Sequence, residues 1–214
     1  MDNVQLLNPS YTFVELGAGR AMLSLALSQV LPNVDLVLID RSGTRRKADV
    51  KLANARRATI DIRDLDLNNC VNNQPTVVFS KHLCGVATDL SIRAALRTKC
   101  EGIAIASCCH QRCTWEDYIN PLFFTHTMTC TPFEFQLIVA MSTWFTCHLK
   151  ENSLIQKEIG LNQQQRAELG KKWKQLLDIG RLEYIQQHST LKTKYIQYCN
   201  LDDTLENHLL LAYT

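Results

Sequence analysis

Residues 11–20 read YTFVELGAGR, and this stretch decides the fold prediction. A short β-rich run, residues 11–16, ends in Gly17-Ala18-Gly19, and residues 20–31 then carry apolar side chains at helical spacing. Glycines between a strand and a helix let the backbone turn sharply and approach a ligand without a Cβ clash. The stretch therefore predicts a cofactor-binding turn at the first strand of an α/β sheet.

The chain on both sides of this turn alternates strands with helices. Apolar runs predict strands at residues 34–39, 58–62, 76–80 and 102–107, and helices are predicted at 87–98, 133–145 and 163–188. Two later strands, 194–198 and 207–213, are joined by a short polar segment and predict an antiparallel pair at the sheet edge. We predict a Rossmann-like α/β fold over residues 1–214, a single catalytic domain with a mostly parallel seven-stranded sheet and helices on both faces.

Composition narrows the class of protein. Apolar residues make up 46% and charged residues 21% of the 214 positions, which is ordinary for a globular domain. No apolar run approaches the roughly 20 residues that cross a bilayer, so we expect no membrane partner. Residues 1–10 lack the pattern of a secretory signal. The nine cysteines are therefore expected to be reduced thiols in the cytoplasm or the nucleus.

Acidic residues mark the ends of three successive predicted strands, at Glu15, Asp40 and Asp61. Glu15 would repel the pyrophosphate of NAD but suits the amino group of a methionine moiety, while Asp40 suits ribose hydroxyls and Asp61 the adenine amino group. The pattern favours S-adenosylmethionine as cofactor and hence the fold of a methyltransferase that depends on it. The predicted cofactor site consists of Glu15, Gly17, Ala18, Gly19, Asp40, Arg41, Asp61 and Ile62. For Glu15 the alternative is a carboxylate that caps the helix or braces the loop.

The fourth and fifth strands end in SKHLCG and SCCHQRC, on the side where ligands bind. An Asn/Asp-Pro-Pro-Tyr type of sequence, used for methylating base amino groups, is absent from strand four, so a hydroxyl acceptor is favoured. We predict that Lys81 orients and activates the hydroxyl and that His110 or His82 accepts its proton. The alternatives are a salt bridge from Lys81 to Asp89 and structural hydrogen bonds for each histidine.

The cysteines of the second segment raise the question of a metal. Cys109 and Cys113 have the spacing of half a zinc site, and His82 and Cys84 complete it only if the two strand ends converge. Because adjacent strand residues point to opposite faces, Cys108 and Cys109 are not expected to bind one ion. We predict no metal site.

Basic residues crowd the segment from Arg41 to Arg63, where few acidic residues offset them. Such a segment beside the cofactor cleft can neutralise phosphates. The predicted RNA contacts are Arg45, Arg46, Lys47, Arg56 and Arg57. The alternative is a solvated helix face.

Six segments give the sequence a resemblance to a known family: FVELGAGRAMLS (13–24), KHLCGVATDL (81–90), IASCCHQRCTWEDY (105–118), MSTWFTC (141–147), LLDIGRLEYIQ (176–186) and LENHLLLA (205–212). The chain resembles the eukaryotic tRNA 2′-O-methyltransferases that modify the fourth nucleotide of the acceptor stem. The resemblance implies S-adenosylmethionine as donor and a tRNA ribose as acceptor. Members of that family carry Cys/His zinc-finger segments before this domain, and none precedes Tyr11 here.

The function predicted from the sequence is therefore methylation of a ribose 2′-hydroxyl in the tRNA acceptor stem. Two alternatives stay open, a methyltransferase acting on a small molecule or protein, and a non-catalytic RNA-binding module with a vestigial cofactor fold. The oligomeric state is not predicted.

Overall fold

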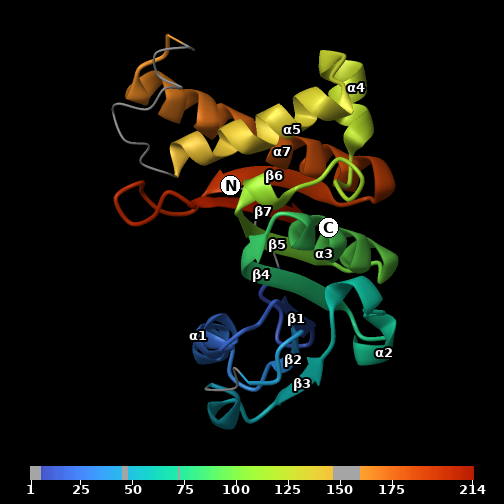
Figure 1. The fold of residues 1–214 in the computed structure, drawn as a ribbon. Coiled ribbons are helices and arrows are strands. Elements are labelled where there is room, and N and C mark those ends of the chain that lie inside the picture. The colour runs from blue at the N-terminus through green and yellow to red at the C-terminus, as the bar shows by residue number, and fades with distance from the viewer. Residues whose placement is uncertain (1–5, 45–47, 72, 147–159) are drawn as a thin grey trace.

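The computed structural model describes residues 6–44, 48–71, 73–146 and 160–214, and these contain one seven-stranded sheet. The strand order is β3-β2-β1-β4-β5-β7-β6, which runs from the bottom to the top of the view in Figure 1. The strands are β1 (Thr12–Leu16), β2 (Asp35–Asp40), β3 (Ala55–Thr59), β4 (Thr76–Cys84), β5 (Gly102–Cys108), β6 (Lys192–Gln197) and β7 (His208–Tyr213). Strands β1 to β5 are parallel to one another, and β7 pairs antiparallel with both β5 and β6. The predicted mixed sheet with its antiparallel edge pair is confirmed.

Helices cover the two faces of the sheet unequally. On one face lies α1 (Met22–Val30); on the other lie α2 (Asn68–Val71), α3 (Val86–Arg97) and the second half of α7 (Gln163–His188) (Figure 1). A third apolar cluster joins α7 to α4 (Pro121–Met128) and α5 (Pro132–Met141), which is followed by the 3₁₀ turn Ser142–Phe145. Three further 3₁₀ turns lie at Asp49–Lys51, Ile62–Asp64 and His110–Arg112. No described helix is long and apolar enough to cross a membrane.

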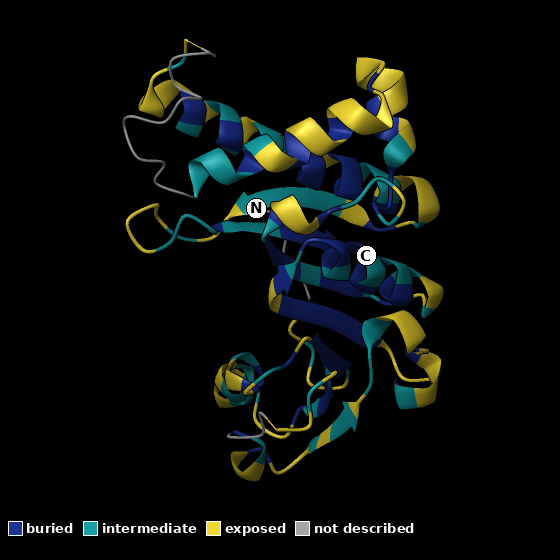
Figure 2. Ribbon diagram, in the orientation of Figure 1, coloured by how far each residue is buried: buried dark blue, intermediate teal, exposed yellow. Residues whose placement is uncertain are grey.

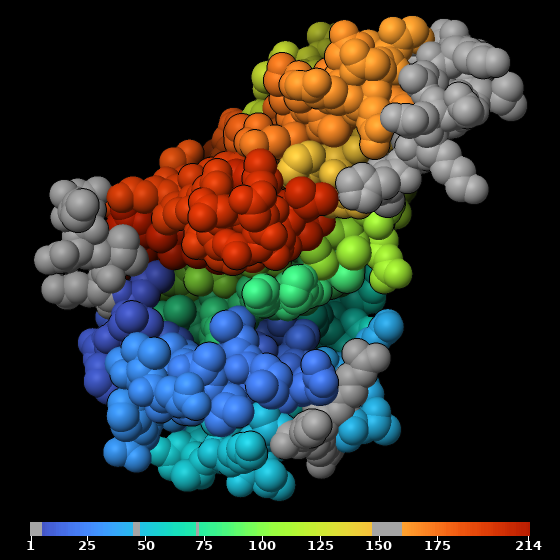
Figure 3. Space-filling view, turned by 90° about the vertical axis from the view of Figure 1, so that its left-hand side faces the viewer, coloured from blue at the N-terminus to red at the C-terminus, as the bar shows by residue number. Residues whose placement is uncertain are grey.

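The central strands could be predicted from the sequence because they are buried. All five residues of β1 are buried, because β1 pairs on both edges and is covered on both faces. Figure 2 shows the buried strands in the middle of the molecule and the exposed outer side of α5. In the view of Figure 3, the N-terminal strands and α1 form the lower part of the surface, with the C-terminal strand pair above them.

Two sequence predictions need correction. The third strand is Ala55–Thr59 and not residues 58–62, because β3 is an edge strand with partly exposed side chains and two arginines interrupt its apolar pattern. Strand β4 continues past residue 80 to Cys84. Within the helix predicted at residues 20–31, the apolar side chain of Val30 is exposed.

The long helix was predicted at its observed bounds, Gln163–His188, and Gly180 does not break it. A Cβ at Gly180 would lie 2.3 Å from the hydroxyl of Tyr118 and 2.9 Å from the ring of Phe123. Glycine is therefore required here for close packing. Sequence analysis missed the short helices α2 and α4. Most of the polar segment 150–161, between the predicted helices 133–145 and 163–188, lies outside the described residues.

Candidate active site

A cleft of about 830 Å³ opens at the carboxyl ends of four neighbouring parallel strands, β3, β2, β1 and β4. Ligands of open α/β sheets bind at this edge, and the volume is within the ~300–1,000 Å³ usual for small-molecule sites. Eight predicted site residues line it: Gly17, Gly19, Asp40, Arg41, Asp61, Ile62, Lys81 and His82. Four separate sequence segments thus meet in one place.

The glycine turn forms the wall of the cleft beyond β1. Gly17 and Gly19 both have positive φ, 68° and 49°, which glycine adopts without strain. A Cβ at Gly17 would lie 3.0 Å from the side chain of Leu83, whereas one at Gly19 would meet nothing closer than 3.9 Å. The backbone N–H of Ala18 donates to the carbonyl of Ile39 at 2.9 Å, so the turn is fixed to β2.

Glu15 lies behind the turn and not in the cleft lining. It is 5% exposed, and its Oε2 accepts hydrogen bonds from both the backbone N–H and the hydroxyl of Ser24, in the first turn of α1. Burial raises the pKa of the Glu15 carboxyl, and the bonds from Ser24 oppose that shift. This geometry is the loop-bracing alternative considered for Glu15. The buried Ala18 also lies outside the lining.

Asp40 and Asp61 present carboxylates to the cleft from two neighbouring strand ends. Asp40 accepts from the backbone N–H of Gly19 at 2.8 Å with one oxygen and from that of Ser42 at 2.7 Å with the other. Asp61 caps the following 3₁₀ turn by accepting from the N–H of Arg63 at 2.9 Å. A carboxylate oxygen has two lone pairs, so these oxygens retain acceptor capacity toward a ligand.

Lys81 and His82 both face the cleft because β4 contains a bulge. The pairing with β5 shifts between Lys81 and Leu83, and His82 adopts a left-handed φ of 66°. The extra residue leaves two consecutive polar side chains exposed and returns Leu83 to the core. The Lys81 ammonium lies 5.9 Å from the centre of the Tyr198 ring, and the alternative salt bridge to Asp89 is not formed.

Asp89 is instead part of a buried ionic network with Arg181. The Arg181 guanidinium donates to Asp89 at 2.7 Å and 3.0 Å and to Asp178 at 2.9 Å, and all three side chains are at most 2% exposed. Burial alone would raise the pKa of Asp178, but the charges and hydrogen bonds of His110 and Arg181 hold it well below its usual value. The network joins α3 to α7 in the interior.

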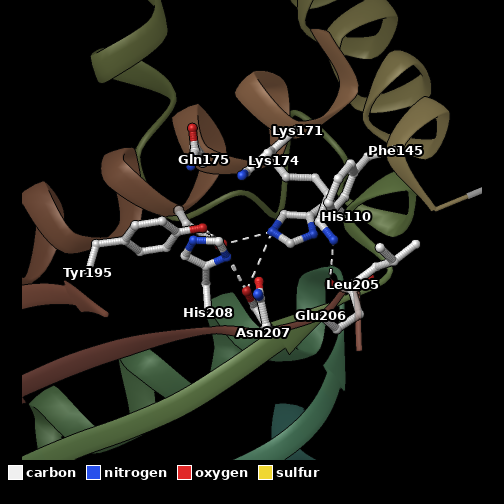
Figure 4. Close-up of a pocket in the computed structure, with 12 residues that line it drawn as sticks. His110, Phe145, Lys171, Lys174, Gln175, Tyr195, Leu205, Glu206, Asn207 and His208 are labelled. Atoms are coloured by element: carbon white, nitrogen blue, oxygen red, sulfur yellow. Dashed lines mark hydrogen bonds and ion pairs between the residues drawn. The ribbon is translucent and has the colours of Figure 1, made fainter. Parts of the chain in front are cut away.

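His110 belongs to this network and not to the cleft. It is 2% exposed, with its Nε2 3.0 Å from an Asp178 oxygen and 3.4 Å from the Ser107 hydroxyl. Figure 4 shows it in a separate pocket of about 10 Å³, between α7 and the strand pair β6–β7. His110 therefore fits the alternative of a histidine that makes structural hydrogen bonds. His82 is the histidine that the structure places beside Lys81.

Two of the predicted RNA-binding residues, Arg56 and Arg57, form ion pairs within the protein. Arg57, whose side chain is 5% exposed, makes two hydrogen bonds to Asp49, at 2.6 Å and 2.8 Å, and one to the carbonyl of Gly19. Arg56 is paired with Asp35, with its side chain 45% exposed. Arg45, Arg46 and Lys47 lie outside the described residues. Arg112 also lines the cleft, but the sequence analysis did not single it out. Its position shortly after the fifth strand, in SCCHQRC, was the available signal.

The thiols after β4 and β5 are arranged differently from the prediction. Cys113 lies apart, 3.2 Å from Arg181, and burial raises its pKa to about 12. Cys108 and Cys109 do not point to opposite faces, because Cys109 has the left-handed conformation φ 50°, ψ 47°. Their sulfurs and that of Cys84 all lie within 4.8 Å of one another.

Comparison with known proteins gives the family. A model described as "Methyltransferase TRM13" matches residues 1–213, almost the whole chain. The chain belongs to the TRM13 methyltransferase family. Among curated relatives, "tRNA:m(4)X modification enzyme TRM13" of Vanderwaltozyma polyspora is 31% identical over 246 residues, which cover 96% of this chain and 57% of the relative. The human TRM13 homolog is 27% identical, covering 99% of this chain and 62% of its own.

The chain thus spans about three-fifths of the length of these relatives. Among solved structures, the Methanococcus jannaschii fibrillarin pre-rRNA processing protein matches with a TM-score of 0.50 at 11% identity, over 98% of this chain and 69% of that one. At this identity the likeness shows the fold alone. The predicted Rossmann-like methyltransferase fold and the family resemblance are both confirmed.

Proposed function

We propose that this chain transfers a methyl group from S-adenosylmethionine to the ribose 2′-hydroxyl of nucleotide 4 in the tRNA acceptor stem. The observation that carries the proposal is the convergence of Asp40, Asp61 and Lys81 on one cleft at the strand ends. Relatives of the chain bear the name tRNA:m(4)X modification enzyme, which supports tRNA as the substrate.

The donor would lie across the glycine turn. Asp40 would accept hydrogen bonds from the ribose hydroxyls of the donor, and Asp61 with the neighbouring Ile62 would meet its adenine. Gly17 and Gly19 allow close approach of the backbone, and Arg41 lies at the exposed rim. Glu15 acts on the donor only through the turn it braces, so it is a positioning residue here. S-adenosylmethionine supplies an electrophilic methyl group when bound.

The acceptor side of the cleft is formed by β4. In-line displacement depends strongly on positioning, which can supply several kcal/mol of the barrier, about 7–11 in model systems. The Lys81 ammonium is exposed in the cleft and can hold the attacking oxygen and stabilise its developing negative charge. The adjacent His82 is the second candidate and would receive the hydroxyl proton directly or through water.

RNA would approach the open side of this cleft. Arg41, Arg63 and Arg112 are exposed around it, and Lys81 lies within it, so four cations face one opening. A-form RNA presents its 2′-hydroxyls in a wide, shallow minor groove, where a protein reaches them without unpairing the stem. These cations replace Arg57 as the proposed phosphate contacts, since Arg57 is buried against Asp49.

The test uses the purified chain, methyl-labelled S-adenosylmethionine and two tRNA transcripts. One transcript is unmodified, and its matched control carries a 2′-deoxyribose at nucleotide 4. The proposal predicts label on the first transcript only, located at nucleotide 4 by nuclease digestion and mass spectrometry. Label on base atoms, or equal labelling of both transcripts, would refute the ribose assignment.

A further inference from the structure

Three thiols converge beside the cleft, and the proposed methyl transfer uses none of them. Cys84 ends β4, Cys108 ends β5 and Cys109 follows directly. The sulfurs of Cys84 and Cys108 are 3.6 Å apart, and that of Cys109 lies within 4.8 Å of both. A search of the described residues for three or more metal-ligating side chains at such distances finds this group.

The backbone brings these thiols together through two turns. Cys84 and Cys108 are directly paired across β4 and β5, so their side chains leave the sheet at the same level. Strand alternation would send the next thiol to the other face, but the left-handed conformation of Cys109 brings it back. Such a conformation is uncommon for a residue with a side chain and is typical of functional turns.

The two turns are also locked against each other. The N–H of Gly85 donates to the carbonyl of Cys108 at 3.0 Å. A Cβ at Gly85, whose φ is +52°, would lie 2.6 Å from the backbone carbonyl carbon of Arg112, so only glycine permits this approach. The thiol positions therefore depend on interlocking backbone and are fixed before any ligand arrives.

The 3.6 Å separation of the Cys84 and Cys108 sulfurs is close to that of two thiolates on one metal ion. With Zn–S bonds of about 2.3 Å, tetrahedral geometry separates two ligand sulfurs by about 3.8 Å. A bound zinc ion deprotonates its coordinating thiols, so three clustered thiols can serve as its thiolate ligands.

We propose that Cys84, Cys108 and Cys109 bind one zinc ion, with the fourth coordination position open toward the cleft. Soft sulfur ligands select zinc over magnesium or calcium. Of the three ligands only Cys84 lines the cleft, so the open position beside it would take water or a ligand bound in the cleft. Three protein ligands with one open position are the arrangement of zinc sites that act on a bound molecule.

The test measures metal on the purified chain, prepared under reducing conditions without chelators, in the absence of donor and tRNA. After zinc is supplied and excess is removed, mass spectrometry of the elements should find about one zinc per chain. Cobalt titrated into the metal-free chain should give sulfur-to-cobalt charge-transfer absorption and the visible bands of a tetrahedral ion. Cys84→Ser should lose most of both signals, whereas Cys70→Ser, a half-exposed thiol on α2, should keep them.

Substoichiometric zinc after loading, or zinc that both Cys84→Ser and Cys109→Ser retain in full, would overturn the proposal. So would a metal-free chain whose peptide map shows a Cys84–Cys108 disulfide. If Cys84→Ser fails to fold, the cobalt spectrum of the unaltered chain and the Cys109→Ser variant decide the question. Because no step involves methyl transfer, failure here is distinct from failure of the proposed function.

Discussion

Two regions with the same residue types behave differently, the cleft at the ends of β1 to β4 and the buried network around Arg181. Both contain aspartates, a histidine and a cation. In the network every charge faces an opposite charge at 3.0 Å or less, and solvent is excluded. In the cleft, Asp40 and Asp61 accept from backbone N–H groups, and Lys81 and His82 are exposed.

The buried network is arranged for stability, whereas the cleft is arranged to bind a ligand. A buried ion pair that has lost one partner leaves an uncompensated charge, which is strongly destabilising. An exposed polar group with spare hydrogen-bonding capacity costs little and remains able to bind a ligand. We therefore expect changes in the network to affect folding and changes in the cleft to affect cofactor binding or turnover.

The largest effect is expected from Arg181→Met, which leaves Asp89 and Asp178 buried without their cation. The free energy of unfolding should fall by about 3–5 kcal/mol. Urea unfolding followed by circular dichroism measures it. The matched control is Arg56→Met, which breaks an exposed pair with Asp35 and should cost no more than about 1 kcal/mol. Equal losses in the two variants would remove the distinction between the regions.

Lys81→Ala tests the cleft from the acceptor side. Turnover should fall by roughly 100-fold or more, because the cation no longer orients the hydroxyl. The dissociation constant of S-adenosylhomocysteine should not change, since the donor contacts lie on β1 to β3. Lys192→Ala, an exposed lysine at the start of β6, is the control. Near-normal turnover of the Lys81 variant would assign activation of the hydroxyl to another group.

Asp40→Asn tests the donor side. Loss of a charged hydrogen-bond acceptor is worth about 1.5–3 kcal/mol, so affinity for S-adenosylhomocysteine should fall by roughly 10- to 100-fold. Calorimetry measures the change. Asp35→Asn is the matched control, because Asp35 begins the strand that Asp40 ends and lies outside the cleft. An equal loss of affinity in both variants would mean that the donor does not contact Asp40.

Glu15→Gln has the smallest expected effect, and its sign depends on pH. Since the folded state raises the pKa of Glu15, the buried carboxyl is favoured while protonated and loses stability as pH rises through the folded pKa. The unfolding free energy of the variant, relative to the unaltered chain, should therefore increase with pH. Glu134→Gln is the control of opposite sign, because hydrogen bonds from Thr131 lower the pKa of Glu134. A pH-independent difference for Glu15→Gln would contradict its buried bracing role.

The sequence predicted those parts of the fold whose side chains are buried on both faces. The apolar run of β1 and the glycine turn after it are local features, and so is the amphipathic pattern of α7. The predicted position of the edge strand β3 was wrong by three residues. Arg56 and Arg57, which pair with Asp35 and Asp49, interrupt its apolar pattern. Those partners are distant in sequence and invisible to periodicity.

The strand ends in the sequence predicted that Gly17, Asp40, Asp61 and Lys81 would lie together, and the structure brings all four into the lining of one cleft. His110 was predicted to lie with them, but it is buried against Asp178, 68 residues further along the chain, and a local pattern does not show such a partner. The prediction that Cys108 and Cys109 point to opposite faces was wrong for a local reason. It assumed ideal strand alternation, whereas Cys109 has a left-handed conformation.

The most direct measurement is a crystal structure of the chain with S-adenosylhomocysteine. The account predicts the ribose hydroxyls within hydrogen-bond distance of Asp40, the adenine beside Asp61 and Ile62, and the sulfur facing Lys81. A ligand bound elsewhere, or one whose ribose makes no contact with Asp40, would contradict it.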